Sequence, residues 1–70
     1  MPHSWRSEIQ YTENGMWVGN AFRFATEDEA QTYASMMAIR HPMIYGIRVQ
    51  ESQLPANYRL DNEGRLLPIE

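Results

Sequence analysis

Cysteine and lysine are both absent from this chain of 70 residues, and histidine occurs twice, at His3 and His41. Without cysteine, neither a disulfide nor a thiolate zinc site can form. The two histidines stand far apart in the sequence, so they do not form a metal-binding motif. We therefore expect no cofactor and no metal, and the lack of cysteine fits a reducing compartment.

Long apolar runs are also missing. No segment reaches the roughly 20 apolar residues of a membrane span. The first residues, Met-Pro-His-Ser-Trp-Arg-Ser-Glu, lack the apolar stretch of a signal peptide. These features predict a soluble cytoplasmic protein that does not contact membranes.

Motifs of catalysis are absent as well. The sequence contains no Gly-x-Ser-x-Gly elbow, no phosphate-binding loop and no Gly-x-Gly-x-x-Gly. The acids at 27–29 are adjacent, and neighbouring residues of a helix splay apart, so they do not form a catalytic pair. A small domain also rarely encloses a pocket with convergent polar groups. We expect that the protein is not an enzyme.

The charge balance is mildly acidic. The formal net charge is −3, whereas nucleic-acid-binding domains usually carry a basic excess. All six basic residues are arginine. Two explanations remain open: a GC-rich genome, or selection for forked cations that stack and pair at an interface.

The length predicts one small domain over residues 1–70, with a core at about 5–51 and a tail or short hairpin at 52–70. Residues 5–12 alternate with period two, which is typical of a half-buried strand. Asn14-Gly15 predicts a type I′ hairpin turn into a second strand at 16–24. This register gives one inward face: Trp5, Ile9, Tyr11, Val18, Phe22 and Phe24.

The same register has one flaw. It places Arg6 opposite Arg23, and like charges that face each other destabilise a sheet. A bulge near Gly19-Asn20 would relieve this repulsion.

A helix is expected next. Thr26 and Glu29 form a capping box at its start, and Pro42 ends it after Arg40 or His41. The sheet-facing positions are Ala30, Tyr33, Ala34, Met37 and His41.

Residues 43–51 predict a third strand, with Tyr45, Ile47 and Val49 facing the core. The fold class is therefore α+β: a small ββαβ domain with an antiparallel sheet of order 2-1-3 and the helix on one face. In the tail, Tyr58-Arg59-Leu60 and Arg65-Leu66-Leu67 predict a short hairpin. Gly64 takes the left-handed position of its loop, and Pro68 ends it.

One set of side chains is predicted on the sheet face away from the helix: Arg6, Gln10, Thr12, Trp17, Arg23, Ile44 and Arg48. Three interpretations remain open. The face contacts a protein partner or a second copy of the chain; it stacks bases and contacts phosphates through Arg6, Arg23 and Arg48; or it is a plain outer face partly covered by the tail. Met36 and Ile39, which point away from the sheet, are further candidates for a partner contact.

Two motifs carry a resemblance. Phe24-Ala25-Thr26-x-x-Glu29-Ala30, followed by Arg48-Val49-x-Glu51-Ser52-x-x-Pro55-x-Asn57-Tyr58, resembles a set of small bacterial and phage proteins over roughly residues 5–60. The resemblance implies an accessory or mobile-element origin and assigns no functional residue. The leading hypothesis is a non-catalytic interaction module that uses its open sheet face or an edge strand, or that associates with itself. The alternative is a nucleic-acid-associated or phage regulatory protein.

Overall fold

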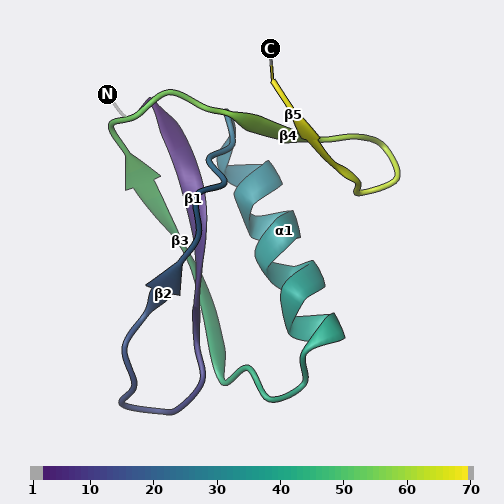
Figure 1. The fold of residues 1–70 in the computed structure, drawn as a ribbon. Helices are drawn as coiled ribbons and strands as arrows, with labels where there is room; N and C mark the ends of the chain where they lie inside the picture. Colours follow the sequence, from purple (N-terminus) through teal and green to yellow (C-terminus); the bar gives the residue numbers. More distant parts are fainter. Residues whose placement is uncertain (1–2, 70) are drawn as a thin grey trace.

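The computed structural model describes residues 3–69 and has the element order β-β-α-β-β-β (Figure 1). The elements are β1 (Ser4–Gln10), β2 (Val18–Gly19), α1 (Glu27–Arg40), β3 (Gly46–Ser52), β4 (Tyr58–Leu60) and β5 (Leu66–Pro68). No helix in this part of the chain is both long enough and apolar enough to cross a membrane.

The sheet confirms the predicted class, a small α+β domain. β1 lies in the centre and pairs antiparallel with β2 on one side and β3 on the other, so the order is β2-β1-β3. Helix α1 packs along β1 and β3 on one face (Figure 1). The helix takes the chain back across the sheet, which allows β3 to run antiparallel to β1 in the adjacent position.

The predicted first turn is wrong. The turn forms one residue earlier than expected, because the Gly15 N–H donates to the Thr12 carbonyl at 3.0 Å. Among the described residues, only Gly64 has a positive φ, so Asn14-Gly15 does not form a type I′ turn. A longer loop over 11–17 replaces the two-residue connection, and β2 shrinks to Val18–Gly19 instead of spanning 16–24.

The register of this hairpin changes along its length. Ile9 pairs with Val18 near the loop, whereas Trp5 pairs with Phe24 at the far end. Between these two pairs, β1 advances by four residues and the opposing segment by six. The opposing segment therefore has two extra residues, which lie within 20–23. The predicted pairing of Trp5 with Phe24 is confirmed, and an irregularity follows Gly19, where the sequence had suggested a bulge.

This shift removes two residues from the predicted inward face. Tyr11 is 51% exposed because β1 ends at Gln10, and Val18 is 48% exposed because it pairs with Ile9 at the edge of the sheet. The buried apolar side chains of the described chain are Ile9, Phe24, Ala30 and Ala34. The core is therefore small and lies between β1 and the first half of α1.

Phe24 is the centre of this core and is fully buried. Its N–H donates to the Trp5 carbonyl at 2.7 Å, and the Trp5 N–H donates back at 2.8 Å. On its other side, Phe24 forms a parallel bridge with Tyr58. One residue thus joins the three-stranded sheet to the β4–β5 pair.

Helix α1 begins as predicted, with Thr26 as its N-cap. The Glu29 N–H donates to Thr26 Oγ1 at 3.2 Å, but the Glu29 side chain does not complete the capping box. Its carboxylate instead accepts hydrogen bonds from the Thr26 hydroxyl at 2.9 Å and from the Leu60 N–H at 3.1 Å. Glu29 therefore links the helix start to β4.

Small residues let the helix approach the sheet. Ala30 and Ala34 are fully buried, and the Ser7 hydroxyl donates to the Ala30 carbonyl at 2.6 Å. His41, which was predicted on this face, is exposed because the helix ends at Arg40.

The third strand begins later than predicted. β3 starts at Gly46 and not at 43, so Tyr45 precedes the strand and is 52% exposed. Ile47 and Val49 share the face of Ile9 and Ser7, their partners on β1, as predicted.

The C-terminal hairpin forms, and Gly64 adopts φ 78° in its loop, as predicted. Asp61 organises that loop: its carboxylate accepts hydrogen bonds from the N–H groups of Arg65 and Glu63 and from Arg65 Nε. These bonds, first among them the one from the Arg65 backbone, hold the pKa of Asp61 below its ordinary value.

Asn57 fastens this hairpin to the segment before the helix. Its Oδ1 accepts the Arg23 N–H at 2.7 Å, and its Nδ2 donates to the Ala21 carbonyl at 2.8 Å. The Asn57 N–H donates to the Arg23 carbonyl at 3.0 Å, and its carbonyl accepts the Ile69 N–H at 2.9 Å. Phe22 packs edge-on against Tyr58 beside these bonds.

We expect Thr26→Ala to lower the free energy of unfolding by about 0.5–2 kcal/mol, because an N-cap and its link to Glu29 are lost. Urea unfolding followed by circular dichroism measures this change. Thr26→Ser, which keeps the hydroxyl, serves as the control. An unchanged midpoint for the alanine variant would show that the cap does not stabilise the helix.

We expect Asn57→Ala to cost about 1–3 kcal/mol, because it leaves the partly buried Arg23 N–H and the Ala21 carbonyl without their partner. Thermal unfolding measures the loss. Asn62→Ala, at an exposed position of the hairpin loop, is the matched control and should remain close to the parent. Equal stability of both variants would contradict the fastening role of Asn57.

Candidate interaction surface

The face of the sheet opposite the helix carries the candidate site. Ser7 and Ile9 point toward α1, so the alternate residues of β1 point to the other side. We call this side the open face, and its members are Arg6, Glu8, Gln10, Trp17 and Arg48. β1 and β3 supply four of these side chains, and the loop before β2 supplies Trp17.

Glu8 lies at the centre of the open face and binds both neighbouring arginines. Its Oε1 is 2.7 Å from Arg48 Nε, and its Oε2 is 3.1 Å from Arg6 Nη2. The Glu8 side chain is only 7% exposed, whereas the arginine side chains are 45% (Arg6) and 41% (Arg48) exposed. A carboxylate this well covered requires the charge-assisted hydrogen bonds that the two guanidinium groups donate.

Trp17 lies beside this cluster, between Arg48 and Gly46 of the sheet. The guanidinium carbon of Arg48 lies 4.3 Å from the centroid of the Trp17 ring, within the range of a cation–π contact. A Cβ atom on Gly46 would come within 3.4 Å of the ring, so the absence of a side chain at Gly46 leaves room for the indole. Arg48 therefore joins the carboxylate of Glu8 to the aromatic face of Trp17.

Gln10 holds the loop that carries Trp17. Its Nε2 donates to the carbonyls of Glu13 at 3.1 Å and Gly15 at 3.0 Å. These bonds fold the 11–17 loop back toward the end of β1. Trp17 is partly buried as a result.

The other predicted members of this face have different roles. The guanidinium of Arg23 donates to the carbonyls of Pro55 at 2.9 Å and Ala21 at 3.3 Å, whereas Arg6 turns to Glu8. The two arginines thus bind separate acceptors, which removes the conflict expected between them. Thr12 is exposed in the loop, and Ile44 lies partly buried in the turn after the helix.

The two helix candidates also differ. Met36 lies against the C-terminal hairpin, since a Cβ on Gly64 would be 3.3 Å from its sulfur, so it helps to dock the tail. Ile39 is 80% exposed. Together with Glu29, Met36 places the β4–β5 hairpin beside α1, as Figure 1 shows, and not across the open face.

Sequence reasoning missed Glu8, which is not among the residues predicted on this face. The signal was present. Arg6 and Glu8 are two apart on one strand and therefore share a face. Arg48 is harder to assign from the sequence, because it lies 40 residues from Glu8. The two residues meet only where β3 pairs with β1.

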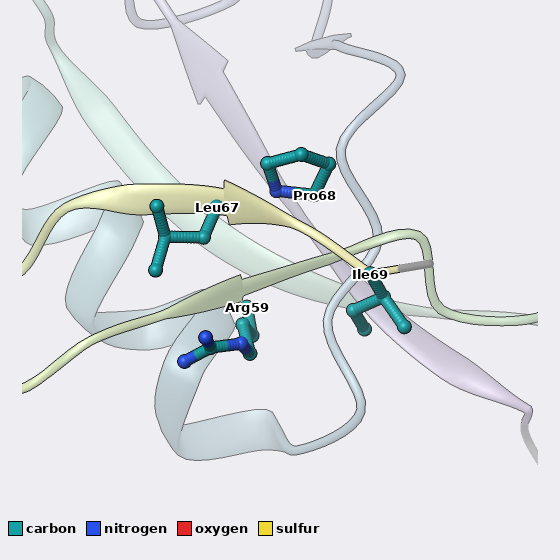
Figure 2. Close-up of a pocket in the computed structure, with 4 residues that line it drawn as sticks. All are labelled: Arg59, Leu67, Pro68 and Ile69. Carbon is teal, nitrogen blue, oxygen red and sulfur yellow. The ribbon is translucent and has the colours of Figure 1, made fainter.

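A groove of about 430 Å³ lies elsewhere, on the C-terminal hairpin. Figure 2 shows its lining side chains, Arg59 of β4 with Leu67, Pro68 and Ile69 at the end of the chain. It has one charged group and lacks the converging polar groups of a typical small-molecule site. Across residues 3–69, no three histidine, aspartate or glutamate side chains gather as a metal site.

We expect Glu8→Gln to destabilise the fold by about 1–2 kcal/mol, because hydrogen bonds to a charged group contribute more than neutral ones and the arginines are partly screened by solvent. Chemical denaturation measures the change. Glu13→Gln, an exposed acid in the adjacent loop, should shift stability by less than about 0.5 kcal/mol. Equal effects at both positions would mean that the cluster adds no stability.

Comparison with known proteins gives no relative: no family model matches the chain, and neither a curated protein nor a solved structure is similar to it.

Proposed function

We propose that this chain is a small non-catalytic interaction module that acts in the cytoplasm and binds a protein partner through its open face. The observation that supports this proposal is the stack of Arg48 on Trp17, held in place by Glu8. Tryptophan and arginine are the residues most enriched among those that dominate binding energy at protein interfaces. An ordered pair of this kind also loses little side-chain entropy when a partner binds.

The chemistry of the face favours a particular kind of partner. Arg48 and Arg6 each use one nitrogen to bind Glu8, and neither guanidinium forms another ion pair within residues 3–69. Their other N–H groups can donate to a carboxylate. The exposed part of the Trp17 ring offers apolar area next to them. A protein surface with an acidic side chain beside an apolar one fits this arrangement.

A nucleic-acid partner receives less support. It would need Arg6, Arg23 and Arg48 to contact phosphates together. Glu8 instead binds two of these arginines, and Arg23 donates to carbonyls next to the C-terminal segment. The resemblance to small phage and bacterial proteins suggests an accessory role and is compatible with either partner.

The test compares Trp17→Ala and Arg48→Ala with Arg59→Ala, an exposed arginine on the hairpin. Cross-linking in the source cells identifies proteins bound by the parent chain, and binding is then measured with the purified partner. We expect both open-face variants to lose at least tenfold in affinity and Arg59→Ala to lose none. Trp17→Ala should cost less than the roughly 3–5 kcal/mol typical of a fully buried tryptophan.

A second measurement addresses nucleic acid directly. The parent and Glu8→Gln are titrated with generic DNA and RNA at two salt concentrations. We expect no binding by the parent. Parent binding that weakens steeply with salt and strengthens in Glu8→Gln, where both arginines are released, would overturn the protein-interface proposal.

A further inference from the structure

The outer edge of β3 presents backbone groups that the fold leaves available. The Trp5 N–H and carbonyl bond to Phe24, so in β1 the odd-numbered residues bond toward β2 and the even-numbered residues toward β3. The β3 partners of those even-numbered residues, among them Arg48 and Gln50, therefore bond inward to β1. Ile47, Val49 and Glu51 direct their N–H and carbonyl groups to the other side.

No helix or strand of residues 3–69 pairs with this edge. β3 contacts β1 and α1 and no other helix or strand of residues 3–69. It contains neither of the usual protective residues of an edge strand, lysine and proline. Its one cation, Arg48, is held over the open face by Glu8 and Trp17 and so does not guard the edge.

We propose that two copies of the chain pair antiparallel through β3, about a two-fold axis at Val49. Val49 then faces Val49 of the second copy, and Ile47 faces Glu51. All three outward residues exchange backbone hydrogen bonds in this register. The two sheets become one continuous six-stranded sheet.

Charge disfavours one of the two neighbouring registers, and strand length disfavours the other. An axis at Gln50 would place Ile47 opposite residue 53, beyond the end of β3, and so lose part of the hydrogen-bonded edge. A shift to an axis at Arg48 would place the two Arg48 side chains directly opposite each other, which is unfavourable. With the axis at Val49, Arg48 faces the neutral Gln50 of the second copy. The pairing therefore combines the full set of edge hydrogen bonds with no like charges opposed.

The helices also fit this arrangement. Helix α1 covers both β1 and β3, so with strands about 4.8 Å apart the two helices would lie about 10 Å from each other, within the usual packing distance. Glu29 and Met36 face the C-terminal hairpin on one flank of α1. The opposite flank, toward the free edge, carries Gln31, Ser35 and Ala38, whose modest size allows close contact.

This pairing uses an edge of the sheet, whereas the proposed function uses a face. Experiments can therefore contradict the pairing through β3 and the proposed function of the open face independently. In the pair, both open faces lie on the same side of the continuous sheet and would present two copies of the Trp17–Arg48 stack.

The absence of cysteine makes the register testable with single substitutions. Val49→Cys places two thiols on opposed residues about 5.5 Å apart between Cα atoms, a distance that a disulfide spans. Ile47→Cys is the control: its two copies are offset by four residues, or about 13 Å along the strand. Under mild oxidation with oxidised glutathione, we expect a covalent dimer from Val49→Cys and none from Ile47→Cys. No dimer from Val49→Cys, or equal yields from both, would overturn the register.

Association itself is measured on the parent by sedimentation equilibrium, with an expected mass of two chains. Glu51→Pro removes one outward N–H while leaving the inward bonds of β3, and should give a monomer with unchanged circular dichroism. Glu51→Ala keeps the N–H and should remain a dimer. A monomeric parent at high micromolar concentration would overturn the proposal, as would a dimeric, folded Glu51→Pro.

If Glu51→Pro does not fold, the cysteine pair decides the question. Trp17→Ala separates the two proposals, since it should remain a dimer even where it loses the partner. A monomeric Trp17→Ala would show that the open face itself mediates association, and would overturn pairing through β3.

Discussion

The fold depends on the position of Phe24. This residue bonds through its backbone to Trp5, bridges to Tyr58, and fills the space between sheet and helix with a fully buried ring. Few other large side chains are so well covered in the described chain, and a domain this small has little apolar surface to bury. Three segments that are distant in sequence therefore meet at one residue, and the helix begins only three residues after it, at Glu27.

Much of this architecture is encoded in local patterns. The alternation of residues 5–12, the Thr26 cap and the left-handed Gly64 each predict the correct element, because each depends on neighbours within a few positions. The first strand nevertheless ends at Gln10, two residues earlier than predicted. The strand order followed from the handedness of the helical connection. The predicted pairing of Phe24 with Trp5 is correct, although the loop that joins their two segments differs from the prediction.

The errors arise where the outcome depends on side-chain partners that residue type alone does not reveal. Asn14-Gly15 has the composition of a tight turn, but Gln10 binds the loop carbonyls and stabilises a longer connection. Glu29 was expected to accept the Thr26 N–H, yet its carboxylate accepts the Thr26 hydroxyl and the N–H of Leu60, 31 positions further along the chain. The central role of Glu8 depends in the same way on Arg48. Leu60 and Arg48 lie far outside a local window of sequence, whereas Gln10 is only three and five residues from its acceptors but matches no recognised turn pattern.

The Asn57 contacts have a consequence for biosynthesis. The segment 21–23 precedes the helix, yet the side chain that satisfies its backbone comes from residue 57, and Phe22 packs on Tyr58. A nascent chain whose residue 57 is still inside the ribosome leaves the Arg23 N–H and the Ala21 carbonyl without these partners. Until Asn57 emerges, the segment 21–23 cannot complete its backbone hydrogen bonds, which leaves it open to non-native contacts.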